Sequence, residues 1–177
     1  MKKEKIRRLC LGALLAAAAL VMGYIEQSVP TLPFLPPGAK AGFSNIAVIF
    51  ACEFLSPFYV FTIVFAKSLF AFLTRGAAAG IMSASGGVLS ALVTLILIKT
   101  AKNQIGIICV SILGALGHNA GQLIAAFVIL SSGGIFYYAP ALIIYALITG
   151  SVNGIISKTV IEHISRITRK ENNENGL

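Results

Sequence analysis

Six apolar stretches, separated by short polar or proline-containing segments, fill most of this sequence. A helix that crosses a bilayer needs about 17–25 mostly apolar residues, and all but one of the stretches reach that length. We therefore predict an all-α integral membrane protein with six transmembrane helices in one bundle. The predicted spans are 9–25, 43–55, 57–73, 80–98, 105–130 and 136–161.

The boundary between the second and third spans is a Ser56-Pro57 step inside one long apolar run, 43–73. Serine suits the cap of a helix and proline suits its first turn, so a new helix is expected to start there. The first span follows a basic start, as in a signal peptide, but no clean small-x-small cleavage site follows it. We read it as an uncleaved membrane helix.

Composition supports the membrane assignment. Hydrophobic residues make up 57% of the chain and charged residues 11%, whereas a soluble domain usually carries about 25% charged residues. A soluble fold of 177 residues could not bury so much apolar surface, because small domains hide a smaller share of it. The composition therefore argues against a soluble globular enzyme.

The acidic residues are six glutamates, and the chain has no aspartate. Binding of magnesium diphosphates requires clustered carboxylates, and ATP hydrolysis by the usual route requires a G-x-x-x-x-G-K-[ST] loop, which is missing. Three isolated cysteines form no C-x-x-C pair, so neither a zinc site nor a disulfide framework is expected. We predict no catalytic residue, metal or cofactor, and we lean away from an enzyme.

Positive charge predicts the orientation in the cell membrane. With six alternating spans, eleven lysines and arginines fall on one side and two, Lys40 and Arg75, on the other. Both termini are therefore expected in the cytoplasm. The net charge of +8 is explained in this way, and nucleic acid is not expected as a partner.

The expected organisation is a basic cytoplasmic N-terminus, a membrane domain and a polar cytoplasmic tail, covering 1–8, 9–165 and 166–177. An outer loop, 26–42, contains four prolines, which disfavour a helix and favour a stiff extended segment.

Ionisable side chains at membrane depth are costly and suggest functional sites. Lys67 and His118 fall near the middle of their spans, whereas Glu53 lies near the inner end of the second. Lys67 could be the counter-charge of an anionic ligand or could pair with Glu53. Glu53 is expected to contact a partner protein or lipid headgroups.

The segment 114–122 carries the densest group of polar side chains in any span. His118 and Gln122 are four residues apart and share a helix face, with Asn119 beside them. They could line a cavity, or the glycines and amides could form a helix-packing seam. The candidate ligand-binding residues are Lys40, Asn45, Lys67, His118, Asn119 and Gln122.

Small residues four apart, such as Gly12 and Ala16 or Ala13 and Ala17, stack along the first span. Such faces let helices approach closely, so they could pack internally or dock another subunit.

Three segments together, 40–45, 83–87 and 114–122, resemble the Gx transporter family, also labelled heptaprenyl diphosphate synthase component I. The resemblance implies a protein similar to the substrate-binding S components of energy-coupling-factor (ECF) transporters. It implies that Ala13, Ala16 and Ala17 dock the energising module and that the loop residues 30–38 cover the pocket. Glu53 is a further candidate for partner docking.

The leading hypothesis is a substrate-binding membrane subunit of an importer that captures a polar or anionic small molecule from outside. A transmembrane energising subunit and ATPases would supply energy. The alternative is a non-catalytic accessory subunit for prenyl diphosphate or quinone synthesis or for membrane electron transfer. The aspartate-rich motifs of prenyl diphosphate synthases do not occur in this sequence.

Overall fold

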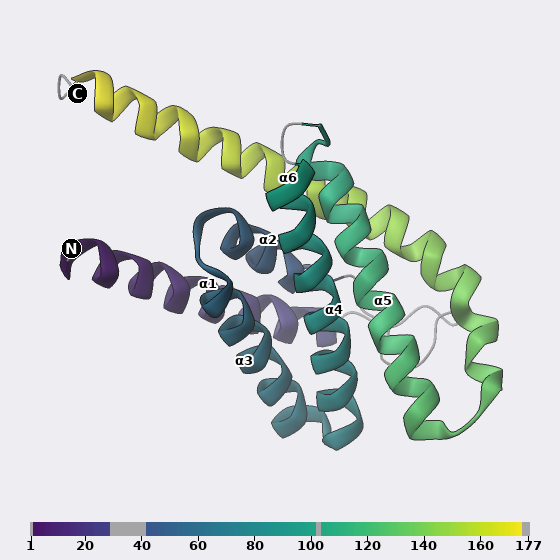
Figure 1. Ribbon diagram of the computed structural model, residues 1–177. Helices are drawn as coiled ribbons and strands as arrows, with labels where there is room; N and C mark the ends of the chain where they lie inside the picture. Colours follow the sequence, from purple (N-terminus) through teal and green to yellow (C-terminus); the bar gives the residue numbers. More distant parts are fainter. Residues whose placement is uncertain (1, 29–41, 102–103, 175–177) are drawn as a thin grey trace.

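The structure, a computed structural model, describes residues 2–28, 42–101 and 104–174, and every element in these ranges is a helix. Figure 1 shows a bundle in which the start of α1 and the end of α6 extend on the same side. The all-α prediction is confirmed. The elements are α1 Lys2–Ser28, α2 Ser44–Phe54, α3 Pro57–Arg75, α4 Ala77–Ala101, α5 Ile107–Leu130, η1 Gly133–Tyr138 and α6 Ala139–Glu174.

Five of the described helices, α1, α3, α4, α5 and α6, are long and apolar enough to cross a membrane. The predicted second span is a helix, but α2 has 11 residues and is therefore about 16 Å long, half the ~30 Å of a hydrocarbon core. It is shorter than the usual membrane-crossing helix. The count of six crossings stays a prediction.

Proline and glycine mark the two ends of α3. α3 begins at Pro57 with Ser56 in an extended conformation before it, as expected, although the Ser56 side chain makes no capping bond. Gly76 separates α3 from α4 with φ +86°, a left-handed conformation that a side chain would strain. The predicted sixth span differs at both ends, because its first residues form η1 and α6 continues to Glu174.

Short α2 forms the centre of the bundle, with every residue from Ser44 to Cys52 buried. It packs against α1, α3, α4 and α6. Large apolar side chains are exposed on the outside of the long helices instead, for example Phe65 at 68% and Val128 at 68%. Large apolar side chains on the outer surface suit a lipid environment.

Glycines allow a close helix contact between α4 and α5. A Cβ on Gly121 would lie 2.6 Å from the backbone oxygen of Ser85 and 2.8 Å from the Cα of Gly86. Neighbouring Gly87 faces α3, where a Cβ would lie 2.8 Å from Cγ1 of Val64. The small residues therefore let backbones approach closely, as in other membrane helix pairs.

Candidate ligand-binding site

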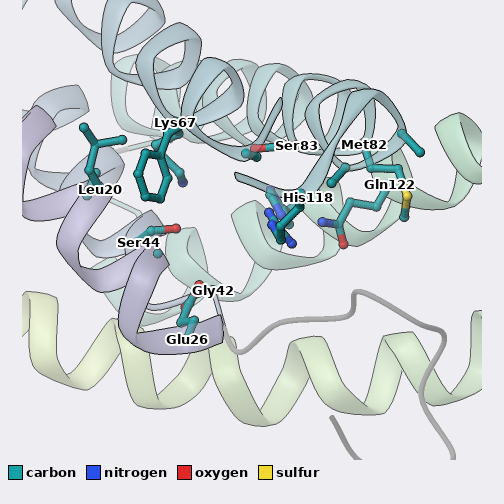
Figure 2. Close-up of a pocket in the computed structure, with 16 residues that line it drawn as sticks. Leu20, Glu26, Gly42, Ser44, Lys67, Met82, Ser83, His118 and Gln122 are labelled. Carbon is teal, nitrogen blue, oxygen red and sulfur yellow. The ribbon is translucent and has the colours of Figure 1, made fainter. Parts of the chain in front are cut away.

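A cavity of about 260 Å³ lies between α1, α3, α4, α5 and the start of α2. Its wall mixes apolar side chains with charged and polar ones. Figure 2 shows Lys67, His118 and Gln122 around this hollow, with Glu26, Gly42 and Ser44 below Lys67 in the view. The polar lining residues are Glu26, Ser44, Lys67, Arg75, Ser83, His118 and Gln122.

Lys67 lines the cavity from α3, and its Nζ donates a hydrogen bond to Oδ1 of Asn45 at 2.9 Å. The two residues are equally far in sequence from Ser56, where α2 ends and antiparallel α3 begins, so the helix hairpin brings them to the same depth. The structure therefore gives Lys67 an amide partner, whereas Glu53 lies at the opposite end of α2.

His118 and Gln122 enter the cavity from α5, one helical turn apart. The adjacent surface of α4 is Gly86, where a Cβ would lie 2.9 Å from Cγ of Gln122 and 3.0 Å from Cε1 of His118. The structure contains both arrangements considered for segment 114–122. Gly121 packs against α4, and the face with His118 and Gln122 lines a cavity.

Asn119 connects two helices and does not face the cavity. It is buried, and its Nδ2 donates to the backbone oxygen of Leu142 at 2.9 Å, which ties α5 to α6. Asn119 does not line this cavity, and Asn45 is connected to it by its hydrogen bond with Lys67. Lys40 and the loop residues 30–38 lie outside the described residues.

Two charged lining residues were not predicted as site residues. Glu26 was expected at the start of the outer loop, but α1 continues to Ser28 and buries Glu26 to 6% exposure. Its Oε1 accepts a hydrogen bond from the backbone N–H of Phe43, next to the start of α2. A carboxylate is favourable there, because helix N-termini carry partial positive charge.

Helical spacing could have predicted Glu26 and Arg75 as lining residues. Ala19, Gly23 and Glu26 line the cavity from one face of α1, and Lys67, Ala71 and Arg75 line it from one face of α3. Extending the first and third predicted spans by one turn would have found both charges.

The small residues of α1 divide between two faces. Gly12 is buried, and a Cβ there would lie 2.9 Å from Cδ1 of Tyr59 in α3. Ala16 packs against the core, whereas Ala13 and Ala17 are exposed. Some small residues of α1 therefore pack inside the bundle, and others lie on its outer face.

Glu53, the other candidate docking residue, is half-buried and lines a separate apolar groove with Ile98 and Ile161. Among the described residues, no three His, Cys, Asp or Glu side chains gather in a way that could hold a metal ion.

The fold and the cavity define a multi-pass membrane protein with a polar hollow inside a helical bundle. The chain belongs to the family described as heptaprenyl diphosphate synthase component I, which matches residues 15–160. The resemblance inferred from the sequence is therefore confirmed.

The chain is also similar to a solved structure reported as the S component of a bacterial ECF transporter, with a TM-score of 0.74. The two sequences are 20% identical, and the match covers 93% of this chain and 98% of that one. Among curated proteins, no match was found. At this identity the likeness establishes a common fold.

Proposed function

We propose that this protein is the substrate-binding membrane subunit of a small-molecule importer and captures a polar or anionic ligand. The observation that carries the proposal is the convergence of Lys67, His118 and Gln122 on one cavity inside the helical bundle. Polar groups at that depth are costly, so their grouping around a hollow is better explained by a ligand than by packing alone.

The charges of the wall favour an anionic or polar ligand. Among the described lining residues, Lys67 and Arg75 are cations, and the carboxylate of Glu26 accepts a hydrogen bond from the start of α2. The volume of about 260 Å³ lies just below the ~300–1,000 Å³ typical of drug-sized ligands, which favours a small molecule over a long prenyl chain.

The proposal includes six crossings, with both termini in the cytoplasm and the cavity opening outward. In Figure 1 the chain ends extend on one side, and the α3–α4 turn that follows Arg75 lies at the bottom, away from them. The excess of lysine and arginine near the chain ends supports this orientation.

Energy would come from partners. The exposed residues Ala13 and Ala17, with Ala16 behind them, are proposed as the docking face for a transmembrane energising subunit, which in turn binds ATPases. Glu53 is proposed as a further docking residue at the inner end of α2.

The family description supports a second candidate, a membrane accessory subunit of a prenyl diphosphate synthase that transports nothing. Co-purification separates the two functions: an importer subunit is retained by a co-expressed energising module, and an accessory subunit by a soluble prenyl synthase.

Native mass spectrometry of the gently purified protein tests the leading proposal directly. We expect a retained small polar or anionic molecule in the wild type. A protein that carries no ligand and binds only a prenyl synthase would contradict the importer function.

A further inference from the structure

A second hollow, much smaller than the ligand cavity, lies deeper in the bundle between α2, α4, α5 and α6. We call it the inner chamber. Its volume is about 10 Å³, close to the smallest space that can hold one water molecule. His118 lines both hollows and so forms part of the wall between them.

The inner chamber is polar on several sides. Ser90, Thr94 and Ser111 line it and are 3%, 1% and 3% exposed, so these hydroxyls lie at the centre of the bundle. Asn153 closes it from α6, and its Nδ2 donates to the backbone oxygen of Gly42 at 3.1 Å. A buried water typically needs two to four such polar neighbours.

One buried nitrogen of His118 needs a hydrogen-bond donor. Nδ1 of His118 is inaccessible and has no hydrogen-bond partner among the described residues. Leaving a buried acceptor unsatisfied is unfavourable, more so inside a membrane-spanning bundle, where bulk water cannot substitute. The imidazole also lies within hydrogen-bonding reach of the backbone of Gly86.

Glycine at position 114 keeps the chamber open. A Cβ on Gly114 would lie 2.7 Å from Oγ1 of Thr94 and 3.6 Å from Oγ of Ser90. Any side chain there would therefore displace the hydroxyls or fill the space that they border.

We propose that the inner chamber binds one water molecule, which donates a hydrogen bond to Nδ1 of His118 and holds the imidazole in its Nε2–H tautomer. The second hydrogen of this water is directed to the hydroxyl oxygens around it. Nε2–H then donates to the Gly86 carbonyl, so both ring nitrogens are satisfied. The water keeps a neutral histidine in the wall of the ligand cavity, whether or not the protein is an importer.

Nitrogen NMR tests the proposal, because the chain has only two histidines, His118 and His163. In a His163→Gln protein labelled with ¹⁵N-histidine and reconstituted in lipid, every ring signal comes from His118. We expect an unprotonated Nδ1, a protonated Nε2 and magnetisation transfer from water protons to Nδ1. A protonated Nδ1, or no transfer from water, would overturn the proposal.

Gly114→Ala fills the chamber and should abolish the transfer to Nδ1. Gly117→Ala is the matched control, because its Cβ faces Cγ2 of Val93 at 3.2 Å and does not line the chamber. It should leave the transfer unchanged.

If Gly114→Ala fails to fold, Ser111→Ala takes its place, because it removes one oxygen from the chamber and adds no volume. It should weaken the transfer to Nδ1. Full transfer in either folded chamber variant would overturn the proposal, because the water would then lie elsewhere.

Discussion

At the scale of single residues, Lys67 links two parts of the site, because its ammonium group binds Asn45 while its side chain lines the ligand cavity. Lys67→Met keeps most of the length of the side chain and removes the charge. A hydrogen bond to a charged group contributes about 1.5–3 kcal/mol, so we expect ligand affinity to fall about 10- to 100-fold. Titration of the ligand identified by native mass spectrometry measures this change.

Lys158→Met is the control for that variant. Lys158 is exposed on α6, where its Nζ lies 3.8 Å from Oε1 of Glu162, and it does not line the ligand cavity. It should bind ligand as the wild type does. Equal affinity of the Lys67 and Lys158 variants would remove Lys67 from the proposed site.

Glu26 connects the end of α1 to the start of α2 through the N–H of Phe43. Glu26→Leu leaves that part-buried N–H without the carboxylate and should cost about 1–3 kcal/mol of stability. Glu26→Gln keeps an acceptor oxygen and loses only the favourable charge near the helix N-terminus, about 0.3–1 kcal/mol. In detergent, the thermal unfolding temperature should therefore be highest for the wild type, lower for Glu26→Gln and lowest for Glu26→Leu.

Glu162→Leu controls for the loss of a carboxylate, because the Glu162 pair with Lys158 is exposed and such pairs contribute about 0–1 kcal/mol. If the Glu26→Leu protein unfolds at a temperature no lower than the Glu162→Leu protein, the α1–α2 connection does not depend on Glu26.

At the scale of helices, the α4–α5 contact depends on glycine. Gly121→Ala places a methyl group 2.6 Å from the backbone oxygen of Ser85, which cannot move without shifting α4. Overpacking of this kind costs about 1–3 kcal/mol, so thermal unfolding should occur at lower temperature. Gly133→Ala meets nothing within 4 Å and is the control, with an expected change within about 0.5 kcal/mol. Equal unfolding temperatures for the two variants would contradict the close contact.

The outward face of α1 gives a prediction about partners. Ala17 is exposed, so Ala17→Phe should leave the fold and ligand affinity intact while it blocks close approach of an energising subunit. We expect co-purification with that subunit to be lost. Val128→Phe places the same side chain at an exposed position of α5 and should co-purify normally. Retention of the partner by the Ala17 variant would exclude this face as the interface.

At the scale of the whole molecule, the proposed orientation predicts which ends of the helices face outward. In a background without the native cysteines Cys10, Cys52 and Cys109, Ala77→Cys at the start of α4 should react with a membrane-impermeant maleimide on intact cells. Ser165→Cys, exposed on α6, should react only after permeabilisation. The opposite pattern would reverse the topology and turn the cavity toward the cytoplasm.

The main features of the bundle are determined by the sequence itself, because apolar length and helix-starting residues act locally. The all-α class, the helix start at Pro57 and the shared face of His118 and Gln122 follow from composition and spacing alone. The sequence also determined the family, through segments spread along most of the chain.

Contacts between helices were decided only by the tertiary structure, because they join residues far apart in the chain. The 11-residue α2 lies buried at the centre, which aligns Asn45 with Lys67 and brings Phe43 to Glu26. Spacing could place Asn119 beside His118, but only the position of α6 made it a link to Leu142. A polar side chain in a membrane helix must find a partner, and the neighbouring helix determines whether that partner is protein, water or ligand.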